Sequence, residues 1–233
     1  MEVLTLAYNQ ALNSPFFGTV LTLVCYYVGR RVGERSRSVL ANPFLIALLL
    51  IVLFLQLCGV PLESYTKGAD LLGVMLVPAT AILGTTIYKQ RLFMKANFLP
   101  IVLGCLAGAV TSILTVYFLC DWFGVRENLC ISLMPKSVTT PIALELARIS
   151  GGIAPLTVAT VAFTGIVGVV LGPILTRWLG IHDPIAIGVA YGTASHVIGT
   201  TKALELGETE GAASGISICV TGFFTVILFL LFF

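Results

Sequence analysis

The stretch YGTASHVIGTTKALELGETEG, from Tyr191 to Gly211, places hydroxyls, one His, one Lys and three Glu next to hydrophobic sequence. The segment that follows, Ala212 to Phe233, is long and apolar enough to cross a membrane. Irregular or polar backbone at membrane depth is tolerated only where protein or a water-filled cavity surrounds it. The stretch therefore predicts a helix that is broken inside a membrane protein.

The composition supports a membrane location for the whole chain. Of its 233 residues, 58% are hydrophobic and only 10% are charged, whereas soluble domains carry about 25% charged residues. A net charge of +2 without a basic stripe argues against a nucleic-acid partner. We therefore expect a polytopic protein of the cell (inner or plasma) membrane.

The N-terminus and the cysteines add two expectations. Met1 to Gln10 contains Glu2 and no Lys or Arg, so it lacks the basic region of a cleaved signal peptide, and the first hydrophobic segment is expected to be retained. None of the six cysteines forms a CxxC pair. We expect core or lipid-facing cysteines, with no disulfide, metal or cofactor role.

Hydrophobic runs predict the membrane segments. Five runs are nearly uninterrupted: Leu12 to Val28, Pro43 to Val60, Phe98 to Leu119, Ala154 to Leu179 and Ala212 to Phe233. A sixth, Ala69 to Tyr88, is broken by Pro78, which removes a backbone hydrogen bond. Two polar segments, 128–150 and 184–210, either span as broken helices or re-enter as hairpins. The two alternatives give eight or six crossings.

Charged loops predict the orientation, because basic loops stay in the cytoplasm. Arg30, Arg31, Arg35 and Arg37 are expected in the first loop, and Lys89, Arg91 and Lys95 precede the run that begins at Phe98. The loop with Asp121, Arg126 and Glu127 is balanced. Both termini are therefore predicted outside the cell.

The two polar segments contain similar sequences. SVTTPIALELA, from Ser137 to Ala147, matches IGTTKALELG, from Ile198 to Gly207, when one gap is allowed. Each copy is typical of a helix start, with Thr140 as an expected N-cap before Pro141, and with a break around His196 to Gly199 before a helix that begins at Thr200 or Thr201. Helix N-termini attract anions, and many transporters bind substrate at two such starts.

The chain resembles the LrgB/CidB family at these motifs and at several others. The segments that carry the resemblance are MPKSVTTPIALEL (134–146), GGIAPLTV (151–158), GIVGVVLGP (165–173), GTASHVIGTTKALELGETEGAASG (192–215) and LVPATAILGTTIYKQ (76–90). The resemblance covers about Leu12 to Phe233. It implies an antiholin-like protein that modulates murein hydrolase export and acts with a separate LrgA- or CidA-like partner. Alternatively, through a plant plastid relative, it implies a transporter of glycolate and glycerate, and some bacterial members are linked to pyruvate.

The candidate residues follow from the two polar segments. Predicted substrate-binding residues are Lys136, Ser137, Thr139, Thr140, Ser195, His196, Gly199, Thr200, Thr201 and Lys202, and predicted coupling-ion or proton sites are Glu145, Glu205 and His196. A Lys inside a membrane is costly and usually functional, although a structural pair with Glu145 or Glu205 is an alternative. Pro78 and Thr80 are expected to line the path of the substrate through the membrane.

His196 has two open interpretations. It either binds substrate or a proton near neutral pH, or it is hydrogen-bonded within the core. Ser195 lies directly beside it in sequence, which does not suit a catalytic dyad, and no Asp lies nearby to orient the imidazole. We therefore expect no enzyme.

The sequence as a whole predicts an all-α integral membrane protein of one domain, 1–233. Its halves are 12–120 and 121–233, with six to eight membrane segments, internal inverted repeats and two broken or re-entrant helices. The favoured function is secondary transport of a small monocarboxylate such as glycolate, glycerate, lactate or pyruvate. The alternative is antiholin-like regulation of lysis. A homodimer is expected by analogy with other transporters.

Overall fold

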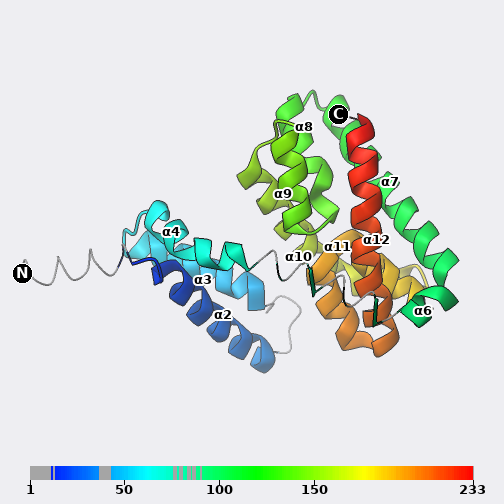
Figure 1. Ribbon diagram of the computed structural model, residues 1–233. Coiled ribbons are helices and arrows are strands. Elements are labelled where there is room, and N and C mark those ends of the chain that lie inside the picture. Colours follow the sequence, from blue (N-terminus) through cyan, green and yellow to red (C-terminus); the bar gives the residue numbers. More distant parts are fainter. Residues whose placement is uncertain are drawn as a thin grey trace, which may run out of the picture. The chain divides into compact units, whose positions relative to one another are not determined.

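The computed structural model describes residues 12, 14–36, 43–75, 78, 81–82, 85, 88–89 and 91–232. Within these ranges the regular structure is helical and contains no strand, as predicted. The chain forms two compact units, Met1–Thr80 and Ala81–Phe233 (Figure 1). The helix that begins at Phe98 belongs wholly to the second unit, and the division into halves at 120–121 stays a prediction.

The first unit contains α2 (Phe17–Ser36), α3 (Pro43–Leu57) and α4 (Leu62–Val74). Helices α2 and α4 cross where Gly18 meets Gly68, because a Cβ added to either glycine would overlap the backbone of the other helix. Thr19 Oγ1 donates to the carbonyl oxygen of Gly68 at 2.6 Å, and Thr22 Oγ1 lies 2.9 Å from the Tyr65 hydroxyl. Close backbone contact and side-chain hydrogen bonds thus hold these helices together.

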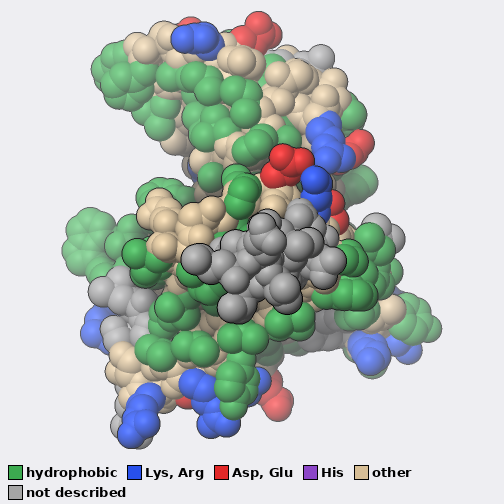
Figure 2. Space-filling view, turned by 90° about the vertical axis from the view of Figure 1, so that its left-hand side faces the viewer, with side chains coloured by type: hydrophobic (Ala, Val, Ile, Leu, Met, Phe, Trp, Pro, Cys, Tyr) green, Lys and Arg blue, Asp and Glu red, His purple; other side chains and the backbone are tan. Residues whose placement is uncertain are grey.

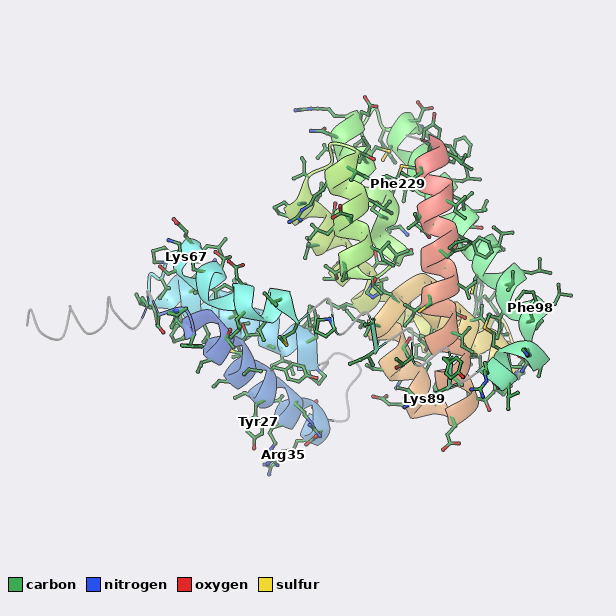
Figure 3. The ribbon with its side chains drawn as sticks, viewed as in Figure 1. Tyr27, Arg35, Lys67, Lys89, Phe98 and Phe229 are labelled. Atoms are coloured by element: carbon green, nitrogen blue, oxygen red, sulfur yellow. The ribbon has the colours of Figure 1, made fainter. Side chains whose placement is uncertain are left out.

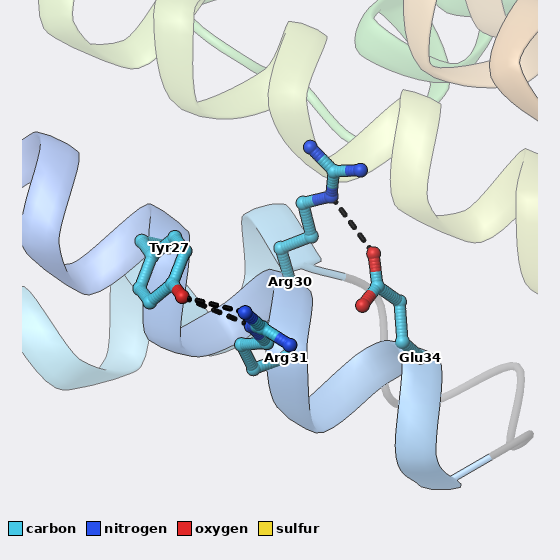
Figure 4. Close-up of polar contacts among 4 residues, drawn as sticks. All are labelled: Tyr27, Arg30, Arg31 and Glu34. Atoms are coloured by element: carbon cyan, nitrogen blue, oxygen red, sulfur yellow. Dashed lines mark hydrogen bonds and ion pairs between the residues drawn. The ribbon is translucent and has the colours of Figure 1, made fainter.

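Helix α2 continues beyond the predicted end at Val28, so placing Arg30, Arg31 and Arg35 in a loop was wrong. Arg30 Nε pairs with Glu34 Oε1 at 2.9 Å, and Arg31 donates from two nitrogens to the Tyr27 hydroxyl (Figure 4). Both contacts join residues four apart, which stabilises a helix. Arg37 lies outside the described residues.

The sixth predicted segment, Ala69 to Tyr88, is described only in part. Its first residues belong to α4, and Pro78 is helical. Thr80 and its neighbours 76–77 and 79 lie outside the described residues, so the break at Pro78 and the role of both residues stay predictions.

The second unit begins with α6 (Arg91–Ala96) and α7 (Phe98–Trp122). It continues through α8 (Glu127–Leu133), the short 3₁₀ helix η1 (Met134–Ser137) and α9 (Thr140–Ile149). The last three helices are α10 (Ala154–Trp178), α11 (Pro184–Leu206) and α12 (Glu208–Phe232). In the described part of the chain, α7, α10 and α12 are long and apolar enough to cross a membrane, and α3 is apolar but has only 15 residues.

Large hydrophobic side chains are exposed over much of the molecule. Trp122, Trp178 and Phe163 are 84%, 81% and 67% exposed. Hydrophobic side chains make up much of the surface drawn in Figure 2. An aqueous surface does not favour apolar exposure on this scale, whereas lipid does.

Helices α7 and α12 run side by side in the same direction. Ile101 and Cys105, near the start of α7, pack with Ala213 and Ile216, near the start of α12. At the other end, Ile113, Val116 and Cys120 of α7 pack with Phe229 of α12. Phe98, at the start of α7, and Phe229, near the end of α12, accordingly lie at opposite ends of this helix pair (Figure 3).

Residues 127–149 turn back on themselves and form what we call the first hairpin. Its outward limb, α8, starts directly after α7, and its returning limb, α9, ends beside α8. Leu146 shares a buried cluster with Cys130 and Ile131, and the Ile153 N–H donates to Ser132 Oγ at 2.7 Å. Both ends of this hairpin therefore lie near the end of α7.

Helix α11 is also bent into a hairpin, the second hairpin, at His196. A Cβ on Gly188, in its first limb, would touch Glu210 and Ala213, and a Cβ on Gly211 would touch Leu204 of its second limb. Both ends of α11 thus lie at the start of α12. Since α12 and α7 are parallel, the two hairpins enter the second unit from opposite ends.

Candidate functional site

The tips of the two hairpins meet beside Val161 of α10. His196 Nε2 lies 3.0 Å from the Val161 carbonyl oxygen, and the Val161 side chain packs in a buried cluster with Val138 of the first tip. The short helix η1 contacts α7, α10, α11 and α12. The structure thus brings the two predicted polar segments together in the middle of the long helices.

The first tip contains the N-terminal end of α9. Pro135 is non-helical, Val138 and Thr139 are extended, and Thr139 rather than Thr140 is the N-cap, so the predicted cap was one residue late. A shift of this size is common because Ser or Thr at either of two adjacent positions can cap. Thr139 Oγ1, however, bonds no backbone N–H and is buried without a hydrogen-bond partner.

Lys136 lies at the same tip and has no carboxylate partner among the residues that the structure describes. Its Nζ donates to Ser112 Oγ of α7 at 3.2 Å and to Ser137 Oγ at 3.3 Å, and these two hydroxyls lie 2.9 Å apart. The ion pairs among the described residues join other groups: Arg30 with Glu34, Lys67 with Glu63, and Lys202 with Glu205. An unpaired Lys at the centre of a membrane helix costs about 3 kcal/mol on insertion scales, so an anionic partner would offset a considerable free energy.

The second tip consists of one strained residue. His196 has φ 44° and ψ −135°, a conformation that favours glycine and costs about 1–3 kcal/mol for other residues. The second limb resumes at Val197, so the predicted helix start at Thr200 or Thr201 was wrong by three or four residues. The helix starts earlier because the bend occupies only one residue.

The remaining predicted residues serve different contacts. Thr200 Oγ1 donates to the His196 carbonyl oxygen at 3.0 Å and lies 2.7 Å from Ser214 Oγ, whereas Thr201 is exposed and bonds Ile198 in its own helix. Ser195 packs against Gly168 of α10, and Gly199 packs against Tyr191 and Ser195. These residues build the second hairpin.

The charged candidates other than Lys136 lie away from the first tip. Lys202 Nζ pairs with Glu205 Oε2 at 2.7 Å, which is the structural alternative left open by the sequence. Glu205 and Glu145 are exposed. The structure therefore groups Lys136, Ser137 and Thr139 at one tip, and it does not bring Lys202 or Glu205 into contact with them.

Two polar residues, the half-buried Ser112 and the buried Tyr191, were missed by sequence reasoning. Ser112 lies with Thr111 and Thr115 in a mostly apolar run, and only the fold reveals its contact with Lys136. The Tyr191 hydroxyl is buried without a hydrogen-bond partner and packs over Gly172 of α10. Tyr191 is the first residue of the polar stretch, but its position two helical turns after Asp183 did not predict that its hydroxyl is buried.

The structure also contains a cavity of about 540 Å³ outside the hairpin tips. It lies at the starts of α7 and α11 and is lined by Pro100, Gly104, Asp183, Ile185, Ala186, Val189 and Ala190. No group of three or more His, Cys, Asp or Glu side chains that could hold a metal occurs in the part of the chain described.

Exposed apolar helices and two hairpins with meeting tips define an all-helical membrane protein. The chain belongs to the LrgB-like family, whose model matches residues 22–233. This confirms the resemblance seen in the sequence.

Several relatives are similar along nearly their whole length. The holin-like protein CidB of Staphylococcus epidermidis is 33% identical, with 90% of this chain and 91% of the relative covered. The antiholin-like protein LrgB of Bacillus subtilis is 30% identical, with coverage of 94% and 95%. The uncharacterized protein YwbG of Bacillus subtilis is 35% identical, with coverage of 91% and 95%. No solved structure matches the chain.

Proposed function

We propose that the chain acts in the membrane as a holin- or antiholin-like regulator of murein hydrolase export, together with a separate LrgA- or CidA-like partner. The names of two relatives, holin-like CidB and antiholin-like LrgB, support this function. A regulator of this kind needs a membrane-embedded surface for its partner. The exposed apolar helices are suited to such a surface.

A second candidate function, transport of a small monocarboxylate, is favoured by the first hairpin tip. The observation that carries it is an uncompensated Lys136 beside the unpartnered Thr139 hydroxyl and the start of α9. All three attract a small anion such as glycolate, glycerate, lactate or pyruvate. Neither candidate involves catalysis.

The groups at the tip are suited to a carboxylate. An ammonium group has three N–H donors, and two of those on Lys136 are directed at Ser112 and Ser137. The third is available to one carboxylate oxygen. Thr139 Oγ1 is available to the other, and so are N–H groups of the first turn of α9, which have no partner within the helix. Pro141 has no N–H to offer.

The two hairpins support an inverted pair with six membrane crossings. Pro135 and His196, the non-helical residues of the two segments, are separated by 61 residues, and so are Thr139 and Thr200. The equal spacing favours a repeat, and entry from opposite ends suits alternating access to one site. Under this proposal the basic C-terminal end of α2 and the basic residues Lys89 to Lys95 are cytoplasmic, and both termini lie outside the plasma membrane.

Coupling to a proton or Na⁺ remains part of the transport proposal. Of the three predicted coupling residues, His196 lies at the second tip, and Glu145 and Glu205 lie on the returning limbs. His196 is the best placed of them, because it contacts α10 where the two tips meet.

Two assays separate the candidates. Purified protein in liposomes is tested for uptake of labelled glycolate and pyruvate, and a deletion strain is tested for autolysis with and without the partner. Saturable uptake that Lys136→Gln removes would support transport. If autolysis responds to the chain while no small monocarboxylate is taken up, the regulatory function stands alone.

A further inference from the structure

Cys120 and Cys130 flank the turn that joins α7 to the first hairpin. Gly124, at φ +60°, ends α7, and the Val125 N–H donates to the Cys120 carbonyl oxygen at 2.8 Å. The Cys130 N–H donates to the Arg126 carbonyl oxygen at 3.0 Å as α8 begins. The turn therefore folds α8 back against α7 and brings the two cysteines to the same side.

The two thiols share one buried environment. Cys120 is 5% and Cys130 7% exposed, and both pack in the cluster that contains Met134, Leu146 and Phe229. Helices α7 and α8, which carry the two cysteines, contact each other beside this cluster. Neither cysteine is in a disulfide.

We propose that Cys120 and Cys130 form a reversible disulfide that joins α7 to the base of the first hairpin. The oxidant is a small disulfide such as oxidised glutathione. The two protein thiols lose two protons and two electrons as their S–S bond forms, while the S–S bond of the oxidant breaks and yields two small thiols. The proposal rests on the turn and the cluster and is independent of the proposed function.

The disulfide would restrain the first hairpin at its base, while Ser112 of α7 already contacts Lys136 at its tip. Since both thiols are buried, the oxidant reaches them only when α8 moves away from α7. The oxidation rate therefore reports opening of the hairpin. In the predicted orientation this turn faces the outside of the cell, where disulfides persist.

The test uses the full chain in detergent or liposomes, incubated with oxidised glutathione, then denatured and labelled with a maleimide tag. The expected number of tags falls from six to four without a change in oligomeric state, and dithiothreitol restores six. Peptide mapping is expected to find Cys120 linked to Cys130. Cys120→Ser and Cys130→Ser should abolish the link, and Cys105→Ser, a buried control on the same helix, should leave it intact.

A second measurement uses only the wild-type protein, so that folding defects of the Cys→Ser variants do not affect it. Oxidised wild-type protein is expected to exchange amide hydrogens more slowly over 126–150 than reduced protein, with no change in α12. The denatured chain, treated with the same oxidant, serves as the control in which cysteines become linked. If the folded protein still carries six tags after a treatment that links the denatured chain, the proposal is overturned. A link between other cysteines, or only glutathione adducts, would also overturn it.

Discussion

The imidazole of His196 and the carbonyl oxygen of Val161, 3.0 Å apart, connect the bend of the second hairpin to α10. The contact holds a residue with φ 44°, and Gly165 of α10 leaves the room, since a Cβ there would lie 2.9 Å from His196 Cε1. His196 therefore has the strained backbone conformation of the bend, and its imidazole holds the bend against α10.

Replacing His196 is expected to reverse the usual order of glycine and alanine in helices. His196→Ala loses the bond to Val161 and keeps the strain, whereas His196→Gly loses the bond but relieves the strain. Glycine should therefore give the higher free energy of unfolding, by about 1 kcal/mol. In an ordinary helix interior, alanine is favoured by about the same amount. Thermal unfolding in detergent measures the difference.

The matched control is the neighbouring Val197, which is helical and exposed. There, alanine should be more stable than glycine. If His196 followed the same order as Val197, the bend would not be located at His196.

Lys136 is expected to matter for binding rather than for folding. Lys136→Met removes a cation without a carboxylate partner, so the free energy of unfolding should stay the same or rise. Loss of a hydrogen bond to a charged group costs about 1.5–3 kcal/mol, which weakens carboxylate affinity about 10- to 150-fold. Ligand-induced thermal stabilisation by pyruvate or glycolate reports the change.

Lys202→Met is the matched control, because Lys202 pairs with the largely exposed Glu205. It should alter affinity less than about fivefold, since exposed ion pairs contribute at most about 1 kcal/mol. Equal effects at Lys136 and Lys202 would contradict the location of the site at the first tip.

The sequence predicted most of the helices and both breaks. Long apolar runs favour helices, and Pro or Gly near a polar segment favours a break, and both effects depend only on residues close in sequence. Pro135 and His196 both lie within the segments expected to be irregular. The extension of α2 was missed because Arg30 was assigned to a loop from its charge, although Glu34 lies one turn away to pair with it.

The composition of the site could be predicted only in part. Lys136 was found because a Lys in apolar sequence is unusual, and Thr139 because of the repeat. Ser112 lies 24 residues from Lys136 in sequence, and only the packing of α7 against η1 brings them together. Lys202 had a sequence signal similar to that of Lys136, but a carboxylate three residues away on its own helix pairs with it.

Thr139→Val is expected to stabilise the ligand-free protein and to weaken anion binding. The hydroxyl is buried without a partner, which costs about 1–3 kcal/mol, and valine has nearly the same shape and tolerates the extended conformation. Unfolding in detergent and ligand-induced stabilisation measure the two effects. Thr139→Ser should keep binding within a few-fold.

Thr221→Val provides the contrast, since Thr221 Oγ1 donates to Thr193 Oγ1 at 3.1 Å. That replacement breaks a buried hydrogen bond and should lower the free energy of unfolding by about 1 kcal/mol. If Thr139→Val destabilised the protein as much as Thr221→Val, Thr139 Oγ1 would have a partner within the protein.

Gly168→Ala is expected to disturb the contact between α10 and the second hairpin. The added Cβ would overlap Ser195 Oγ and lie 2.7 Å from Ser195 Cβ, so one helix must move. Overpacking of this kind costs about 1–3 kcal/mol. Gly73→Ala in α4 is the control, since nothing lies within 4 Å of a Cβ there. It should stabilise the protein by about 0.5–1 kcal/mol.

A double-mutant cycle assigns the clash to Ser195. In a Ser195→Gly background the side chain that meets residue 168 is absent, so Gly168→Ala should become neutral or slightly stabilising. The coupling free energy between the two positions is then expected to be at least about 1 kcal/mol. Additive effects of the two changes would mean that α10 and the first limb of α11 do not pack at these residues.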